Sequence, residues 1–147
     1  MDRCKLANDY HKMGFNCSQS VLCAFSDLTG LSMQEASNIA GGFGGGAGTG
    51  ELCGAVSGAV MTLGVLTPVD LSDPAGSKKR TVALSREFQK RFSERFDALR
   101  CQDLLKKKAL PTQENAPAAM RLGVTSHCSA MIVTAVEIVE EMLSERS

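Results

Sequence analysis

The sequence has no tryptophan and only one tyrosine among its 147 residues. With so few large aromatic side chains, we expect aliphatic residues, alanine and methionine to fill most of the core. No stretch reaches the ~18 uninterrupted apolar residues that are typical of a membrane span. The N-terminal segment lacks the apolar region of a secretory signal. These absences argue against a membrane span and against export, and they predict a cytoplasmic location.

Strand patterns are missing as well, because no alternation of apolar and polar residues is bounded by turns. Helix starts are frequent instead. Asn16 with Gln19, and Ser32 with Glu35, have the spacing of capping boxes, and the pair Asp73-Pro74 is typical of a helix N-terminus. The sequence therefore predicts one all-α domain over residues 1–147, a helical bundle of about six to seven helices with a glycine-rich loop.

Two parts of this prediction concern the second half of the chain. Residues 110–123 contain two prolines and are expected to form a connecting loop. A long amphipathic helix should follow, beginning at Thr125 or Ser126.

Charge of one sign is scarce between residues 78 and 108, which carry eleven Lys and Arg but four Asp and Glu. The formal net charge is nevertheless zero, and acidic residues gather in the last predicted helix at Glu137, Glu140, Glu141 and Glu145. Nucleic-acid-binding domains usually add base-stacking aromatics or a recognisable module, and neither is evident. We interpret the basic segment as a solvated helix face and expect no nucleic-acid partner. A homodimer through one of the long helices stays open.

Glycine is abundant only in residues 41–58, where it fills nine of eighteen positions. The lysine of a phosphate-binding P-loop is missing, and the G-x-G-x-x-A match in this run follows a helical segment instead of a strand. Gly54 and Gly58 share one face of the next predicted helix, where missing side chains let another backbone approach. We interpret this segment as a close-packed wall that holds the Cys53 thiol near the first turn of a helix.

Four of the six cysteines occupy the same kind of place, the start of a predicted helix. We call Cys17, Cys53, Cys101 and Cys128 the helix-start cysteines. The partial positive charge of a helix N-terminus favours the thiolate, the form that binds metals or attacks disulfides. Arg100 and His127 are each adjacent to one of these cysteines and would act in the same direction. Cys4 and Cys23 lack this placement and are interpreted as packing or surface thiols.

Helical periodicity predicts that Cys17 and Cys128 face the interior of the bundle. Cys17 heads a stripe that continues through Val21, Ala24 and Leu28. Cys128 heads a seam of apolar residues spaced four and three apart along the last helix. We therefore expect the sulfurs of the helix-start cysteines to share one pocket at the heads of their helices.

The same cysteines carry a resemblance to a known family. The segments NCSQSV, CGAVSG, LRCQDLL and HCSAMIVTAVEIVEEML resemble the C_GCAxxG_C_C family of small proteins described as "putative redox-active", which is defined by a C-G-A-x-x-G motif and four cysteines. The resemblance covers nearly the whole chain. It implies that Cys17, Cys53, Cys101 and Cys128 are the functional residues, but it brings no defined reaction.

Three functions remain open at this point. The first is thiol–disulfide or electron-transfer chemistry, and thus an oxidoreductase activity, by the helix-start cysteines, supported by Gly54, Gly58, Arg100 and His127. The second is a zinc ion or an iron–sulfur cluster bound by the same four cysteines. The third is a non-catalytic helical module in which the thiols only pack.

The spacing of the cysteines excludes some kinds of redox and metal site but does not decide between the three functions. No C-x-x-C exists, which excludes a thioredoxin-type pair, and no C-x-x-C-H exists, which excludes covalent c-type haem. The helix-start cysteines are 36, 48 and 27 residues apart, unlike compact zinc or ferredoxin motifs. A helical bundle can still gather ligands from four helices. The electron or thiol partner is not identified by the sequence.

Overall fold

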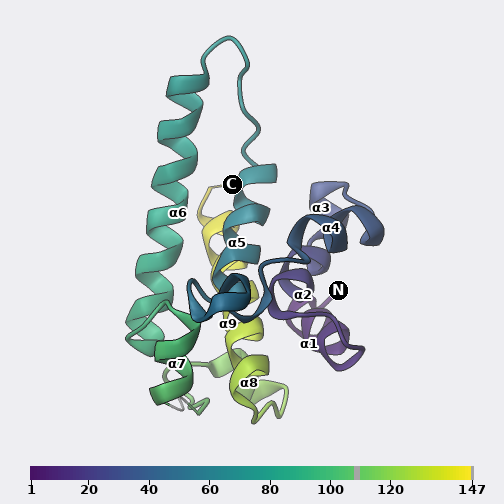
Figure 1. Cartoon of the computed structure of the whole chain (residues 1–147), viewed down its shortest axis with the longest axis vertical. Coiled ribbons are helices and arrows are strands. Elements are labelled where there is room, and N and C mark those ends of the chain that lie inside the picture. The colour runs from purple at the N-terminus through teal and green to yellow at the C-terminus, as the bar shows by residue number, and fades with distance from the viewer. Residues whose placement is uncertain (108–109, 147) are drawn as a thin grey trace.

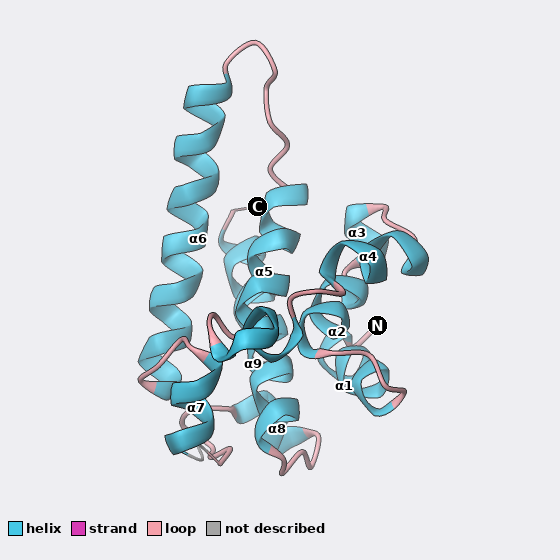
Figure 2. Ribbon diagram, in the orientation of Figure 1, coloured by secondary structure: helices cyan, strands magenta, loops and turns pink. Residues whose placement is uncertain are grey.

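The computed structural model describes residues 1–107 and 110–146, which form an all-α bundle (Figures 1 and 2). The elements, in chain order, are α1 (Arg3–Lys12), α2 (Cys17–Ala24), α3 (Ser26–Thr29), α4 (Met33–Ala40), the π-helical turn η1 (Gly46–Gly50), α5 (Gly54–Val65), α6 (Pro74–Phe96), α7 (Cys101–Lys107), α8 (Pro117–Arg121) and α9 (His127–Glu145). The all-α prediction is confirmed, with more helical segments in the described residues than expected.

The predicted helix starts form as the sequence indicated. The Asn16 carboxamide accepts a hydrogen bond from the Gln19 N–H at 2.8 Å, and the Gln19 side chain accepts one from the Asn16 N–H at 2.9 Å. Ser32 and Glu35 form the same reciprocal pair at the start of α4. Each box satisfies two backbone N–H groups that a helix N-terminus would otherwise leave without a partner. These caps fix where the helices begin.

The sequence misjudged two connections. The helix that was expected to carry the stripe from Cys17 to Leu28 divides at Phe25, whose ring is fully buried and whose backbone leaves the helical region. Leu28, expected on the buried stripe, is therefore 47% exposed. Residues 110–123 contain a short helix, α8, because Pro117 takes the first helical position, where its fixed φ is favourable. Lys108 of the basic segment lies outside the described residues.

Helix α9 is the centre of the bundle and packs against α1, α2, α5, α6 and α8. Its predicted apolar seam from Ile132 to Met142 is buried. Phenylalanine contributes more to the core than the composition suggested, because Phe25, Phe88 and Phe92 are among the largest fully buried side chains. No helix in the described residues combines the length and the apolar character needed to cross a bilayer.

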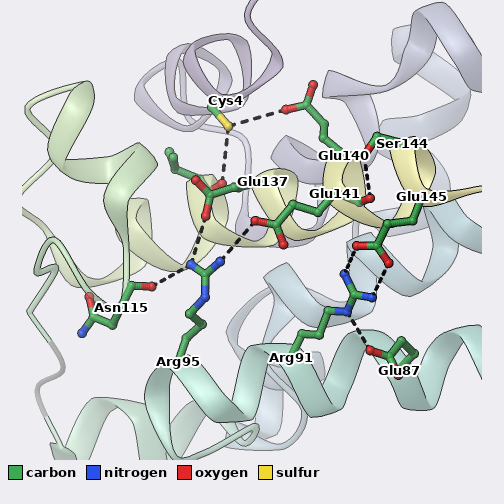
Figure 3. Close-up of polar contacts among 11 residues, drawn as sticks. Cys4, Glu87, Arg91, Arg95, Asn115, Glu137, Glu140, Glu141, Ser144 and Glu145 are labelled. Atoms are coloured by element: carbon green, nitrogen blue, oxygen red, sulfur yellow. Dashed lines mark hydrogen bonds and ion pairs between the residues drawn. The ribbon is translucent and has the colours of Figure 1, made fainter.

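Ion pairs fasten α6 to α9, as Figure 3 shows. The Arg95 guanidinium lies 3.0 Å from a Glu137 oxygen and 3.4 Å from a Glu141 oxygen. Arg91 lies 2.7 Å from Glu145. The interpretation of the basic segment as a solvated face is thus wrong for these two arginines, which neutralise part of the acidic cluster in α9.

Candidate functional site

Each helix-start cysteine lies at a helix N-terminus, as predicted. Cys17 and Cys101 are the first residues of α2 and α7, and Cys53 is the N-cap of α5. Cys128 is the second residue of α9. All four are thiols in this structure.

The fold brings these four sulfurs together. In each pairing the sulfurs are near enough for a charge on one to shift the pKa of the other, so the four thiols form one group. The other two cysteines lie elsewhere. The Cys4 thiol donates to the Val133 carbonyl at 3.6 Å, and the Cys23 sulfur lies 3.6 Å from the Ser37 hydroxyl. The four cysteines that lie near one another in the structure are thus the same four that the helix-start pattern selected.

A short backbone pairing holds Cys53 beside Cys101. An antiparallel bridge joins Leu52 to Arg100. Around it, the Cys53 N–H donates to the Leu99 carbonyl at 2.8 Å, and the Cys101 N–H donates to the Glu51 carbonyl at 2.6 Å. Because side chains alternate along extended backbone, Cys53 and Cys101 project from the same face of this bridge. Nothing in the sequence pattern indicated this pairing.

The glycine-rich segment closes over the cluster at positions where a side chain would not fit. A Cβ at Gly46 would lie 2.4 Å from the Glu51 nitrogen and 2.9 Å from the Cys101 Cβ. At Gly54 it would lie 3.1 Å from the Cys17 Cβ. The predicted close approach of another backbone at Gly58 also occurs, since a Cβ there would meet the Ser18 carbonyl at 2.6 Å. The glycines therefore set the distances between the elements that carry the thiols.

The Cys17 thiol, on α2, and the Cys128 sulfur, on α9, act on each other's pKa as hydrogen-bond donor and acceptor. The hydrogen bond from Cys17 is the main cause that lowers the pKa of Cys128 to about 6, against the opposing effect of burial. The same bond, followed by burial, raises the pKa of Cys17 well above that of an ordinary thiol. The pair is therefore arranged as a thiol that donates to a thiolate.

The other two helix-start cysteines are held as neutral thiols. Burial raises the pKa of Cys53 to about 11, and the N–H groups of Ala55 and Val56 lower it by a smaller amount. The Cys53 side chain does not form a capping hydrogen bond at the start of α5. Burial and then the charge on Cys128 raise the pKa of Cys101. The expectation that all four helix N-termini would favour a thiolate is thus wrong for three of them. Loss of solvent outweighs the helix dipole at Cys53 and Cys101, and the hydrogen-bonding effect of Cys128, followed by burial, outweighs it at Cys17.

A comparison with protein-family models adds a second line of evidence. The model of the C_GCAxxG_C_C family, described as "putative redox-active protein", matches residues 15–142. The chain belongs to this family. All four helix-start cysteines lie inside the matched region. Comparison with curated proteins and with solved structures finds no match.

Charged neighbours of the cluster in this C_GCAxxG_C_C protein differ from those expected. The Arg100 guanidinium binds the Glu51 carboxylate at 3.1 Å and is not among the charges that act on Cys101. His127 does lower the pKa of Cys128, after the Cys17 hydrogen bond. His11 acts in the same direction, although no spacing in the sequence connects it with α9. Its Nδ1 donates to the Phe15 carbonyl at 3.2 Å, which orients the ring.

The cluster does not fit a metal centre as it is arranged. Four thiols are suitable donors for zinc or an iron–sulfur cluster. Within the described residues, however, no three His, Cys, Asp or Glu side chains are grouped so that they could hold one ion.

Proposed function

We propose that this C_GCAxxG_C_C protein carries out two-electron thiol–disulfide exchange, with Cys128 as the nucleophile and Cys17 as the resolving thiol. The opposite pKa shifts of these two side chains, each caused mainly by the other, carry the proposal. A thiolate is the attacking species in disulfide exchange, and a second thiol in contact with it is needed to complete the transfer. Cys128 and Cys17 supply these two groups.

In the first step the Cys128 thiolate attacks one sulfur of a partner disulfide. A bond forms between Cys128 and that sulfur, the partner S–S bond breaks, and the other partner sulfur leaves as a thiolate. Both side chains are only partly buried, so a partner sulfur has access to the pair.

In the second step Cys17 loses its proton and attacks the Cys128 sulfur. The Cys17–Cys128 disulfide forms, and the remaining partner sulfur leaves as a thiolate that takes up the proton. One thiolate and one thiol of the protein are oxidised to a disulfide, and one partner disulfide is reduced to one thiolate and one thiol. The timing follows from the electrostatics, because the mixed disulfide on Cys128 carries no charge. The Cys128 charge that raised the pKa of Cys17 has then disappeared, and Cys17 ionises more readily.

Cys53 and Cys101 form a second dithiol in this proposal, which returns the electron pair to the Cys17–Cys128 disulfide by internal exchange. Diagonal neighbours across an antiparallel pair lie roughly 7–8 Å apart, which exceeds the usual Cα separation of a disulfide. The bridge that fixes Cys53 and Cys101 therefore has to shift before they can join. Hence we expect this pair to be oxidised second.

Oxidation of the reduced chain with bis(2-hydroxyethyl) disulfide tests the proposal. Peptide mapping should show loss of two thiols and a bridge between the Cys17 and Cys128 peptides. Cys17→Ser should stop at a mixed disulfide on Cys128, and Cys23→Ser, outside the cluster, should react as the wild type does. A first bridge between any other two cysteines, or a folded chain that keeps all its thiols, would overturn the assignment.

A further inference from the structure

A second site lies beside the first turn of α9, the turn to which Cys128 belongs. It is a cavity of about 210 Å³ between the end of α1, the segment that precedes α9, and the start of α9 itself. Asn8 and Lys12 line it from α1, and Thr125, Ser126 and Ser129 line it from the α9 side. The volume corresponds to about seven water molecules at ~30 Å³ each, which suits a small ion or the end of a small molecule.

Buried polar groups in this cavity have no partner. Asn8 is 7% exposed and Ser129 is 8% exposed, and neither side chain makes a hydrogen bond within the described residues. Neither is among the side-chain atoms that are fully sealed from solvent. Because both residues line the cavity, their polar side-chain atoms are accessible from it. Buried amide and hydroxyl groups are normally hydrogen-bonded to protein or to water, so these two side chains are free to bind a ligand with polar atoms that displaces solvent from the cavity.

The electrostatics of the cavity select a negatively charged ligand. The Lys12 side chain forms no ion pair within the described residues, and no acidic residue lines the cavity. The Ser126 side chain does not cap α9, which leaves the Cys128 and Ser129 N–H groups at the positive end of a 19-residue helix without that acceptor. Backbone N–H groups of this kind bind carboxylates and phosphates.

We propose that this cavity, lined by Asn8, Lys12 and Ser129, is an oxyanion site that binds the carboxylate of a small thiol or disulfide substrate. The proposal rests on the thiol–disulfide exchange proposed above and specifies its substrate class. The site and the nucleophile belong to the same turn of α9, and His11, which acts on Cys128, is adjacent to Lys12 in α1. A carboxylate held by Ser129 and the first N–H groups of α9 is bound within one helical turn of Cys128.

The test compares two disulfides that differ in charge, bis(2-carboxyethyl) disulfide and bis(2-hydroxyethyl) disulfide. Oxidation of the wild-type chain should reach half its maximal rate at a lower concentration of the carboxylated probe. Lys12→Met should raise that concentration about tenfold or more for the carboxylated probe, as expected for loss of a charge-assisted hydrogen bond, and leave the neutral probe unchanged. Asn8→Ala should act in the same direction. Lys5→Met removes the same charge from α1 outside the cavity and serves as the control.

A binding measurement separates this inference from the proposed reaction. Inorganic phosphate should compete with the carboxylated probe alone, and it should raise the unfolding temperature of the wild type but not that of Lys12→Met. If neither disulfide oxidises the chain, the proposed function fails, while the phosphate shift still decides the site. Equal use of both probes by the wild type and by Lys12→Met, or a phosphate shift that is unchanged in Lys12→Met, would overturn the oxyanion site.

Discussion

The two halves of the cysteine cluster are built in opposite ways. Cys17 and Cys128 meet through their side chains, between two helices, and share one proton in a hydrogen bond. Cys53 and Cys101 are positioned by their backbones, through the bridge between Leu52 and Arg100. In the first pair the pKa of one sulfur is lowered, whereas in the second pair the pKa of both sulfurs is raised.

The difference shows that a helix N-terminus is not enough to make a thiolate. All four cysteines have that position, yet burial dominates at Cys53 and Cys101. Only Cys128 receives a hydrogen bond from another thiol, and this contact decides which sulfur is ionised. The backbone thus positions Cys53 and Cys101 without lowering the pKa of either sulfur. In the other pair, the contact with Cys17 lowers the pKa of Cys128.

The largest effect should come from breaking the backbone-held pair at Gly46. Gly46→Ala adds a Cβ 2.4 Å from the Glu51 nitrogen, at a residue whose φ of 66° already disfavours a side chain. We expect a loss of about 2–4 kcal/mol in the free energy of unfolding, measured in urea.

Gly48→Ala is the matched control for Gly46→Ala. Gly48 also has a positive φ, but a Cβ there meets nothing within 4 Å. The free energy of unfolding of this variant should fall by only about 1–2 kcal/mol, the cost of a side chain on left-handed backbone. Equal losses in the two variants would show that the segment does not close against the cluster.

The activated pair should respond to the loss of its hydrogen bond. Cys17→Ala removes the donor that lowers the pKa of Cys128 from 9.0 to about 6. The rate at which iodoacetamide alkylates Cys128 at pH 7 should fall about tenfold, because a thiolate fraction smaller by up to roughly a hundredfold is partly offset by the greater nucleophilicity of a more basic thiolate. Cys17→Ser keeps a hydroxyl donor at this position and should retain much of the rate. Alkylation of Cys128 that is equally fast in Cys17→Ala would remove the reason for the asymmetry.

The contributions of Cys128 and Cys53 to stability should depend on pH with opposite signs. The folded-state pKa of Cys128 is depressed, so its contribution is complete above pH 9 and is lost as the pH falls toward about 6. The folded-state pKa of Cys53 is raised, so its contribution is complete below pH 9 and is lost as the pH rises through about 11.

Urea unfolding at several pH values would measure these slopes. Subtracting the curve of Cys128→Ser from that of the wild type should leave a stabilisation that grows from pH 6 to pH 9. The same subtraction with Cys53→Ser should leave one that shrinks above pH 9. Slopes of the same sign would contradict the comparison between the pairs.

The smallest expected effect comes from the histidines near Cys128. His127 and His11 both lower the pKa of Cys128, but they follow the Cys17 hydrogen bond in importance. His127→Gln should slow alkylation of Cys128 at pH 6 about two- to threefold, the scale of a partly exposed charge pair. A His127→Gln rate as low as that of Cys17→Ala would assign the activation to the imidazole instead of the thiol.

Local sequence was sufficient to locate the helix starts. Capping residues such as Asn16 and Ser32 act within one turn, so their hydrogen bonds could be predicted without the fold. The selection of four cysteines from six rested on the same local rule, and the structure places those four together. The break at Phe25 escaped prediction because it depends on where that ring is buried.

The chemistry of the cluster could not be predicted in the same way. Contacts such as the Leu52–Arg100 bridge and the approach of His11 join residues far apart in the chain. The degree of burial decides the pKa of Cys53, and burial is a property of the packed bundle. Which sulfur is ionised therefore became apparent only once the helices were assembled.

Site-resolved alkylation of the wild-type chain tests the central claim most directly. The rate of iodoacetamide reaction at each of the four helix-start cysteines would be followed by mass spectrometry as a function of pH. The account predicts that Cys128 reacts first, with a midpoint near pH 6, and that Cys17, Cys53 and Cys101 react only above the pH at which an ordinary thiol ionises. The account would be contradicted if the midpoint for Cys128 lay at the pH where an ordinary thiol ionises, or if Cys53 or Cys101 reacted before Cys128.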